Sequence, residues 1–484
     1  MEFFSDQWAE HVTIPQLQES MDTGELTAAR LTWFFLHRIA AHDRQNASIN
    51  SILEINPEAL QIAEALDWER RQSGPRGPLH GIPVVLKDNI DTGDKMRTSA
   101  GTLALADSRA YQDAFVVSQL RSAGAVILAK ANLTELANAM SDEMPTGYSA
   151  RGGQTLNPYG PGTIPVGGSS AGSGAAVAAN FAAAGIGTET SGSILNPASL
   201  NSIVAIKPTV GLVSRTGIIP ISVTQDTAGP MTRSVTDAAV VLGAMTGIDD
   251  EDPATRGSFN RYYTDYTPFL DRAGLSGMRI GIPREYLAEL EPSQRALIDR
   301  ALDVMRAEGA VVIDPASIAE TMDKRRSPVT GYEFKPALNA YLDRLAPHTP
   351  VHSLRELIDY NFKHAPATVK YGQMKLIERE TASGRLTEAD YIEALAEDLR
   401  VAKDTGIDKI MAEHQLDALV FAGSHGSGLA AKAGYPSITV PAGYDAEGVP
   451  LGITFTARAF EEPTLIRIAY AFEQATQHRV PPKL

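Results

Sequence analysis

The stretch from Val166 to Gly217 constrains the fold most, because Gly, Ser, Ala and Thr stand there in place of the longer side chains found elsewhere. Two parts of it matter: residues 167–174, which lead into an apolar run from Ala175, and residues 187–193. A glycine-rich turn that opens a helix directs several backbone N–H groups at one point, which suits either a phosphate or an oxyanion. The stretch therefore predicts closely approaching backbone segments around a site for negative charge.

The spacing of the glycines argues against a nucleotide phosphate. A P-loop needs a Gly-Lys dipeptide, and the sequence contains none. The dinucleotide pattern Gly-x-Gly-x-x-Gly fails at Gly172 and Gly174, because Val177 stands where the third glycine is needed. An oxyanion site is therefore the better interpretation.

Residues 168–172 also match the Gly-x-Ser-x-Gly nucleophile elbow, with Ser170 at its centre. An elbow needs a strand directly before it and His and Asp partners elsewhere in the chain. Here a loop rich in Pro and Gly precedes the pattern, and three candidate histidines lack supporting context: His364, His414 and His425. The elbow stays a weak alternative.

Helical and strand-like segments alternate along the rest of the chain. A short apolar run at 82–86 ends at Lys87, and helical periodicity at 115–121 is followed by an apolar strand at 125–129. Further strands are expected at 278–283, 310–313, 418–421, 438–441 and 451–456, and further helices at 292–308 and 465–475. This order predicts an α/β fold with a large mixed β-sheet sandwiched between α-helices.

The chain of 484 residues is long enough for one large domain with additions. Residues 1–66 are expected to form an N-terminal helical region packed on the core, with Thr27 near a helix start. Residues 67–484 would form the main α/β domain. A segment at about 249–385, richer in charge, Pro and Tyr, predicts an insertion or cap around the mouth of a pocket.

Composition excludes several functional classes. A net charge of −15 disfavours nucleic acid as a partner, and the absence of Cys removes disulfides and thiol chemistry. The ten histidines show no paired ligand spacing, so neither a metal nor another cofactor is expected. Residues 1–10 lack a basic export signal, and no apolar run reaches the roughly 20 residues of a membrane span. We therefore expect a cytoplasmic protein.

Three separated motifs resemble those of the amidase signature family over nearly the full chain. Lys87 stands in the segment 81–89, and Ser169 and Ser193 lie 24 positions apart in the two glycine-rich loops. Residues 205–211, 225–230 and 433–443 also look like segments of that family. The resemblance implies the amidase signature fold and hydrolysis of a carboxylic amide to a carboxylate plus ammonia or an amine.

The resemblance also implies roles for individual residues. Ser193 matches the nucleophile, Ser169 the bridging serine, which follows a cis peptide bond, and Lys87 the base of a Ser-Ser-Lys triad. The implied oxyanion hole consists of the backbone N–H groups of Thr190, Ser191, Gly192 and Ser193. Substrate contacts are expected from Met140, Ser141 and Gly168.

A lysine base has a physical requirement that the sequence meets. A serine hydroxyl must lose its proton to act as a nucleophile, and a lysine accepts that proton only if burial depresses the pKa of its ammonium group. Lys87 directly follows an apolar strand, so desolvation is expected.

Two departures from the family pattern concern the second loop. Glu189 replaces the common Asp, and Leu195 stands where an Arg is usual, so an Asp-Arg contact that supports the loop is absent or replaced. This version is closer to the peptide amidase and aryl acylamidase branch than to the A-type proteins of amidotransferases. Arg215 and Asp226 are expected to brace the core loops.

Two alternatives and several details stay open. The chain could be a glutaminase component of amidotransferase A type, or a non-catalytic binding protein on the same fold. The partner is expected to be a small-molecule or peptide amide, with aliphatic, aryl and peptide C-terminal amides all possible. The protein could be a monomer or a homodimer.

Overall fold

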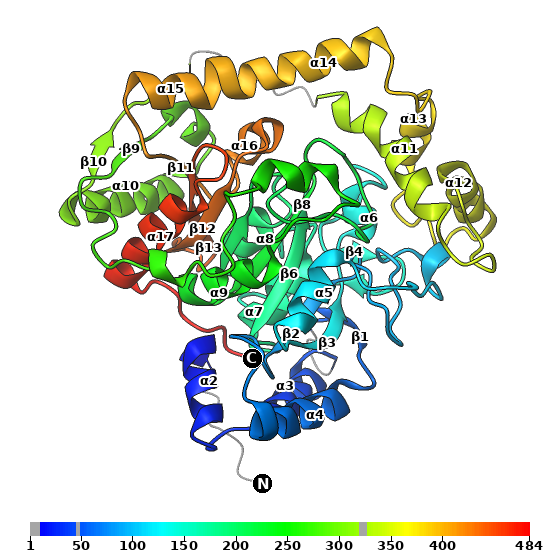
Figure 1. The fold of residues 1–484 in the computed structure, drawn as a ribbon. Helices are drawn as coiled ribbons and strands as arrows, with labels where there is room; N and C mark the ends of the chain where they lie inside the picture. Colours follow the sequence, from blue (N-terminus) through cyan, green and yellow to red (C-terminus); the bar gives the residue numbers. More distant parts are fainter. Residues whose placement is uncertain (1–9, 45–48, 319–326) are drawn as a thin grey trace.

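An eleven-stranded β-sheet runs through the middle of the molecule, with helices around it (Figure 1). The computed structural model describes residues 10–44, 49–318 and 327–484. The expected absence of an export signal rests mainly on residues 1–9 and falls outside this range.

The strands are β1 (Ile52–Ile55), β2 (Pro83–Lys87), β3 (Val126–Ala131), β4 (Tyr148–Ser149), β5 (Gly153–Gln154), β6 (Ala184–Glu189), β7 (Val204–Lys207), β8 (Thr227–Thr232), β9 (Arg279–Gly281), β10 (Val311–Ile313), β11 (Ala418–Ala422), β12 (Ser437–Tyr444) and β13 (Pro450–Thr456). The α-helices are α2 (Ile14–Asp22), α3 (Ala28–His42), α4 (Ala59–Ser73), α5 (Phe115–Ser122), α6 (Glu135–Asn138), α7 (Ala171–Ala178), α8 (Leu195–Leu200), α9 (Val235–Met245), α10 (Pro292–Ala307), α11 (Val329–Leu342), α12 (Leu354–Lys363), α13 (Met374–Glu380), α14 (Ala389–Leu399), α15 (Asp408–Glu413), α16 (Ser427–Ala433) and α17 (Glu462–Thr476). Short 3₁₀ segments are η1 (Leu103–Leu105), η2 (Pro253–Ser258), η3 (Thr267–Phe269) and η4 (Arg284–Leu287), and a π-helical segment, η5, covers Arg400–Ile407.

The large sheet is mixed. Its strand order is β1-β3-β2-β6-β8-β7-β12-β13-β11-β9-β10, and β4 and β5 form a separate two-stranded sheet. Neighbours are parallel among β3, β2 and β6 and again among β11, β9 and β10, and they are antiparallel elsewhere. The predicted α/β fold with a large mixed sheet between helices is confirmed.

Small residues allow the central strands and α7 to approach one another closely. A side chain at Gly187 in β6 would lie 2.8 Å from the sulfur of Met231 and from the hydroxyl of Ser170, and one at Gly229 in β8 would lie 2.0 Å from the Ile206 carbonyl oxygen. Helix α7 packs against β6 and β2 through this region, and all of its residues are buried. The glycine-rich stretch is thus the close-packed centre of the domain.

The predicted N-terminal helical region needs one correction. Thr27 does cap a helix, since its side chain accepts a hydrogen bond from the Arg30 N–H at 3.1 Å at the start of α3. However, β1 lies within residues 1–66 and forms an edge strand of the large sheet beside β3. Its four residues were too few to show a strand period between two helices.

The segment 249–385 contains two different kinds of structure. Its first part holds β9, α10 and β10, and both strands belong to the large sheet. Its later part, α11 to α13, lies to one side in Figure 1 and packs on a separate apolar cluster that includes Leu133, Met140 and Ile219. Residues 319–326 of the predicted insertion lie outside the described residues.

Candidate active site

Lys87 lies at the carboxyl end of β2, which runs parallel to β6 with Leu86 opposite Ile186. This register brings its ammonium group to Thr188, near the end of β6. Lys87 Nζ donates hydrogen bonds to the Thr188 carbonyl oxygen at 3.0 Å, to Thr188 Oγ1 at 2.9 Å and to Ser169 Oγ at 2.7 Å. The side chain is fully buried.

Burial sets the protonation of Lys87. Desolvation lowers the pKa of its ammonium group from 10.5 to about 7, although the negative charges of Glu189 and Asp226 act in the opposite direction. A neutral amine is therefore available near pH 7, as the sequence argument requires of a lysine base.

Ser169 follows a cis peptide bond, Gly168-Ser169, as the family resemblance implies. Its carbonyl oxygen accepts a hydrogen bond from the Thr134 N–H at 3.0 Å, which holds the turn just before α7. The neighbouring Ser170 points elsewhere: its hydroxyl donates to the Thr188 carbonyl at 3.1 Å and accepts from the Thr188 N–H at 3.2 Å. Ser170 thus has no basic partner among the described residues, which disfavours the nucleophile-elbow alternative.

The second loop places Ser193 beside this turn. The Ser193 carbonyl oxygen accepts the Ser170 N–H at 3.1 Å, and Gly192 has a φ of 78°, a left-handed conformation that favours glycine. Within the described ranges, no protein acceptor takes the N–H groups of Ser191, Gly192 or Ser193. These donors are available for an oxyanion.

Glu189 provides the support that the sequence departures left open. Its Oε2 accepts hydrogen bonds from the N–H groups of Ile194 at 2.6 Å and Leu195 at 3.0 Å. One buried carboxylate thus closes the loop from within the same segment. The contact expected from the family pattern is therefore replaced by a carboxylate–backbone contact that needs no Arg at position 195.

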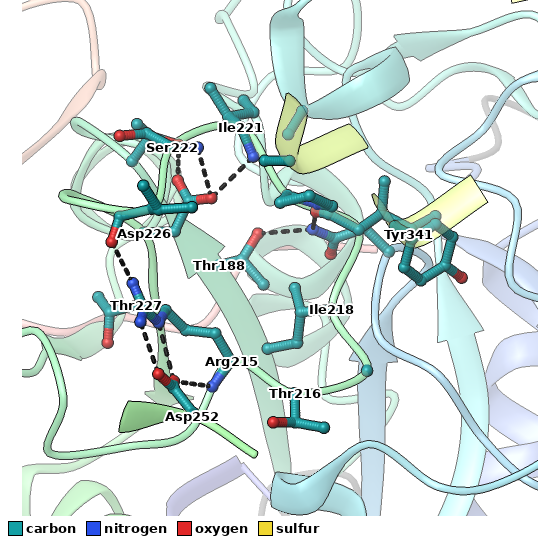
Figure 2. A pocket seen from close by; sticks show the side chains of 18 of the residues that line it. Thr188, Arg215, Thr216, Ile218, Ile221, Ser222, Asp226, Thr227, Asp252 and Tyr341 are labelled. Atoms are coloured by element: carbon teal, nitrogen blue, oxygen red, sulfur yellow. Dashed lines mark hydrogen bonds and ion pairs between the residues drawn. The ribbon is translucent and has the colours of Figure 1, made fainter. Parts of the chain in front are cut away.

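Asp226 and Arg215 brace the neighbouring loops, as predicted. Asp226 Oδ1 accepts from the Thr190 hydroxyl at 2.5 Å, and its Oδ2 accepts from two backbone N–H groups of its own loop at 2.7 and 2.8 Å. Arg215 forms an ion pair with Asp252 at 2.6 Å (Figure 2). Burial raises the pKa of the Asp226 carboxyl, while the Thr190 hydrogen bond lowers it.

Two cavities meet at the second loop. The front cavity, about 440 Å³, contains Ser193 in its wall, and the rear cavity, about 310 Å³, contains Asn89 and Thr188 in its wall (Figure 2). Three residues line both: Ala137, Thr190 and Ile221. The nucleophile candidate therefore faces one cavity, while the residues that contact the lysine face the other.

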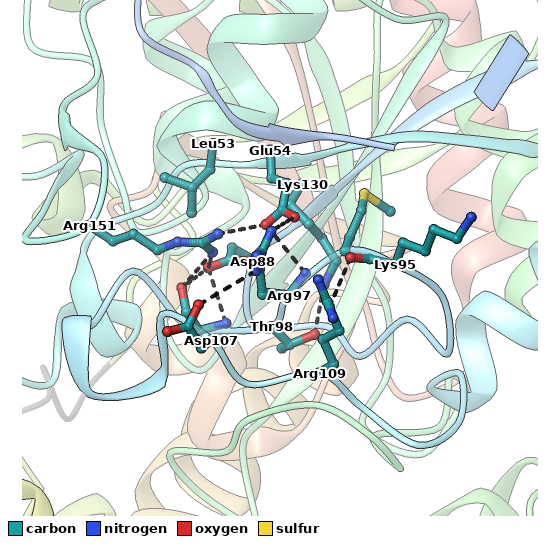
Figure 3. A network of polar contacts seen from close by, with 12 residues as sticks. Leu53, Glu54, Asp88, Lys95, Arg97, Thr98, Asp107, Arg109, Lys130 and Arg151 are labelled. Carbon is teal, nitrogen blue, oxygen red and sulfur yellow. Dashed lines mark hydrogen bonds and ion pairs between the residues drawn. The ribbon is translucent and has the colours of Figure 1, made fainter. Parts of the chain in front are cut away.

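A polar network fixes the segment that follows Lys87 (Figure 3). Asp88 accepts hydrogen bonds from the Ser99 hydroxyl and from the N–H groups of Ser99 and Gly101, both at 3.2 Å. Arg151 lies 3.6 Å from Asp88 and forms an ion pair with Glu54 of β1 at 2.6 Å. The network joins β1, β2 and the loop before β5, so it holds the backbone at Lys87 in place.

The residues predicted to contact substrate occupy other places. Met140 is fully buried in the apolar cluster under α11–α13, and the Ser141 hydroxyl accepts the Glu143 N–H at 3.2 Å. Gly168 donates its N–H to the Asn196 side chain at 3.1 Å. The described walls of the two cavities instead contain residues just upstream, Ala137 and Asn138.

The buried histidine that the sequence singled out is structural. His80 Nε2 lies 2.9 Å from the Leu66 carbonyl oxygen, and its Nδ1 accepts the Arg76 N–H at 3.1 Å. In the part of the chain that the structure describes, there is no group of three or more His, Cys, Asp or Glu side chains suited to hold a metal ion. Over the same residues, no helix is both long and apolar enough to cross a membrane.

Sequence reasoning missed two residues of the site. Thr188 contacts the lysine through two oxygen atoms, and Asn89 donates to the same Thr188 hydroxyl at 3.0 Å. Both stood inside motifs that the sequence singled out. Their contacts depend on the parallel register of β2 and β6, which no local pattern reveals.

Comparisons with known proteins agree with this geometry. The chain matches the family described as Amidase over residues 30–466. It is 41% identical to a probable amidase of Arabidopsis thaliana over 486 residues, which cover 98% of this chain and 92% of the plant protein. It resembles the X-ray structure of the native peptide amidase from Stenotrophomonas maltophilia with a TM-score of 0.90 and 45% identity, covering 98% of each chain. The A-type protein of the glutamyl-tRNA(Gln) amidotransferase of Chloroflexus aurantiacus is 34% identical over 501 residues, covering 98% of this chain and 99% of that protein.

Proposed function

This chain belongs to the amidase family and is an amide-hydrolysing enzyme, and we propose that it acts through an acyl-enzyme formed on Ser193, with Ser169 and Lys87 as proton carriers. The observation that carries this proposal is the 2.7 Å hydrogen bond between Lys87 Nζ and Ser169 Oγ in a fully buried setting. A lysine whose pKa lies near 7 is matched to proton transfer at neutral pH.

In the acylation step, the Ser193 oxygen forms a bond to the amide carbon while the carbonyl electron pair moves onto oxygen. The Ser193 proton passes to Ser169, whose own proton passes to the neutral Lys87 amine. The N–H groups of Ser191, Gly192 and Ser193 stabilise the negative oxygen, and each such donor contributes on the order of 3 kcal/mol to lowering the barrier.

Collapse of this intermediate breaks the C–N bond. Ser169 returns a proton to the leaving nitrogen and is itself reprotonated by Lys87, so that ammonia or an amine departs neutral. Water then attacks the ester carbon and gives its proton to the same relay. The carboxylate leaves, and Ser193 regains its proton.

Peptide C-terminal amides are the first substrates to test among the three classes that remain. The support for this choice is the similarity to the Stenotrophomonas maltophilia peptide amidase at 45% identity. Aliphatic and aryl amides are the other two classes.

A hydrolysis screen tests the proposal. Ammonia or amine release would be measured with one peptide amide, one aliphatic amide and one aryl amide, with the Ser193→Ala protein as the control. We expect release from at least one class by the natural protein and none above background by the variant. Equal release by both proteins would refute Ser193 as the nucleophile.

A second candidate function is that of an amidotransferase A-type glutaminase. The 34% identity to such a protein over nearly the whole of both chains favours it, whereas the Glu189-supported loop differs from the pattern associated with that branch. Glutamine hydrolysis that appears only when partner proteins are added would support this candidate. Failure of the protein to react with a serine-directed fluorophosphonate would favour a non-catalytic binding protein.

A further inference from the structure

The front cavity has the opposite charge to the protein as a whole. The chain carries a net charge of −15, yet the described wall of this cavity contains Lys375, Arg379 and Lys432 and no Asp or Glu. His425 also lines it, but burial lowers the pKa of its imidazole, so it adds little positive charge at neutral pH. Three permanent cations thus share the wall that contains Ser193.

The carboxylates that pair with the two lysines lie outside the cavity wall. Lys375 forms an ion pair with Asp142 at 2.8 Å, and the Asp142 side chain is 59% exposed, so that solvent screens this pair. Lys432 forms an ion pair with Asp398 at 2.8 Å. The positive ends of both pairs are therefore the ends that border the cavity.

Arg379 is held in place by contacts other than a carboxylate of the cavity wall. Its guanidinium lies 4.5 Å from the centre of the Phe334 ring, and its Nη1 donates to the Ala139 carbonyl oxygen at 3.5 Å. A planar guanidinium fixed on an aromatic ring is suited to bind a carboxylate with two parallel hydrogen bonds.

An uncharged donor completes the lining. The Tyr286 side chain borders the front cavity, and its hydroxyl is buried with no partner among the residues that the structure describes. The rear cavity contrasts with this wall, because it includes Glu189, Asp226 and two further carboxylates of the loop at 251–252. The two sides of the catalytic loop thus differ in charge.

We propose that the acyl part of the substrate carries a carboxylate, which Lys375, Arg379 and Lys432 hold in the front cavity. This inference rests on the proposed function, because it assigns a substrate class to the same Ser193 site. Acidic peptide amides are the compounds that combine this charge with a carboxamide.

Matched peptide amides test the charge alone. N-acetyl-Glu-Leu-amide would be compared with N-acetyl-Gln-Leu-amide, and N-acetyl-Leu-Glu-amide with N-acetyl-Leu-Gln-amide, because Glu and Gln side chains have nearly the same shape. In at least one pair we expect kcat/KM for the acidic amide to be roughly tenfold higher in low salt, and the ratio to fall toward one in about 0.5 M salt. Ratios of one or below in both pairs would overturn the inference and leave the proposed function intact.

Variants link any preference to the cavity. Arg379→Met and Lys432→Met should each lower the Glu/Gln ratio several-fold, whereas Arg379→Lys should retain part of it. Lys409→Met, at an exposed lysine that pairs with Glu413 of α15 at 3.8 Å, is the matched control and should leave the ratio as it is. A preference that survives both Met variants would overturn the assignment to this wall.

Binding to the Ser193→Ala protein separates the two proposals, because it requires no turnover. Calorimetric titration with the same four amides should show tighter binding of the acidic partner in at least one pair. If no amide is hydrolysed by the natural protein while the acidic amides bind tightly, the proposed function fails and the anionic site stands. Equal binding within both pairs would refute the anionic site.

Discussion

The pH dependence of the reaction follows from the burial of Lys87. The change in pKa from 10.5 to about 7 corresponds to about 5 kcal/mol of lost ammonium stabilisation, since one pKa unit equals about 1.4 kcal/mol. The sign is fixed by the proposed role: the neutral amine is the active form, so the rate rises as pH rises through the folded-state pKa.

The magnitude distinguishes a depressed pKa from an ordinary one. With a pKa of about 7, the neutral fraction of Lys87 increases about tenfold between pH 6 and pH 8 and then levels off. With the ordinary value it would increase about 100-fold over the same interval and continue to rise to about pH 10. The assay is kcat/KM against pH from 5 to 10, with samples returned to pH 8 to confirm that inactivation is reversible.

Two variants serve as controls for this profile. Lys87→Met should lose several orders of magnitude in kcat at every pH, while a substitution of His80, which is bound through both ring nitrogens, should leave the midpoint unchanged in any variant that folds. A profile that is flat from pH 5 to 9, or one that keeps climbing above pH 9, would refute the reasoning. So would a midpoint that persists in Lys87→Met.

Three further results are expected. Thr188→Val removes one acceptor of the Lys87 ammonium and should move the kcat/KM midpoint to lower pH by about one unit; an upward shift would contradict this. Glu189→Ala leaves the Ile194 and Leu195 N–H groups without their acceptor and should lower kcat about 100-fold in a folded protein, whereas Glu189→Gln should lose less, and equal rates for the two would contradict the loop's dependence on this contact. Burial raises the pKa of Glu135 from 4.5 to about 8, so the stability that its protonated form provides is present below pH 4.5 and is lost as pH rises through 8. Glu135→Gln should therefore raise the free energy of unfolding by up to about 3 kcal/mol at pH 7 and much less at pH 4.5, as measured by urea denaturation.

The residues of the site that lie next to a strong local pattern were predictable from the sequence. The apolar run 82–86 is strand β2, and its end places Lys87 in the core as expected. The regularly patterned helices α10 and α17 and the strands β9 to β13 also appear within a few residues of their predicted bounds. In each case a period or an apolar run is visible within one segment.

The central strands β6, β7 and β8 were not predicted, because their composition conceals them. Strand β6 reads Ala-Gly-Ile-Gly-Thr-Glu, and β8 contains Gly229 and Pro230, residues that are unfavourable in isolated strands. They are strands because α7 and neighbouring backbones leave no room for larger side chains, as the 2.0 Å approach at Gly229 indicates. Such a constraint arises from tertiary packing and leaves no periodic signal.

The contact that replaces the usual support of the catalytic loop was equally hidden. The sequence showed that Glu189 and Leu195 depart from the family pattern, but not that the longer carboxylate would accept two backbone N–H groups of its own loop. The charge of the front cavity was hidden for a related reason. Its cations come from α13 and α16, which are far apart in the sequence.

Covalent labelling of Ser193 tests the central claim most directly. The natural protein and Ser193→Ala would be treated with a serine-directed fluorophosphonate near pH 8, where the Lys87 amine is mostly neutral, and their intact masses and peptide maps would be compared. The account predicts one adduct per chain, located on Ser193, and no adduct on the folded variant. An adduct of equal yield on the variant, or one located on Ser170 in the natural protein, would contradict it.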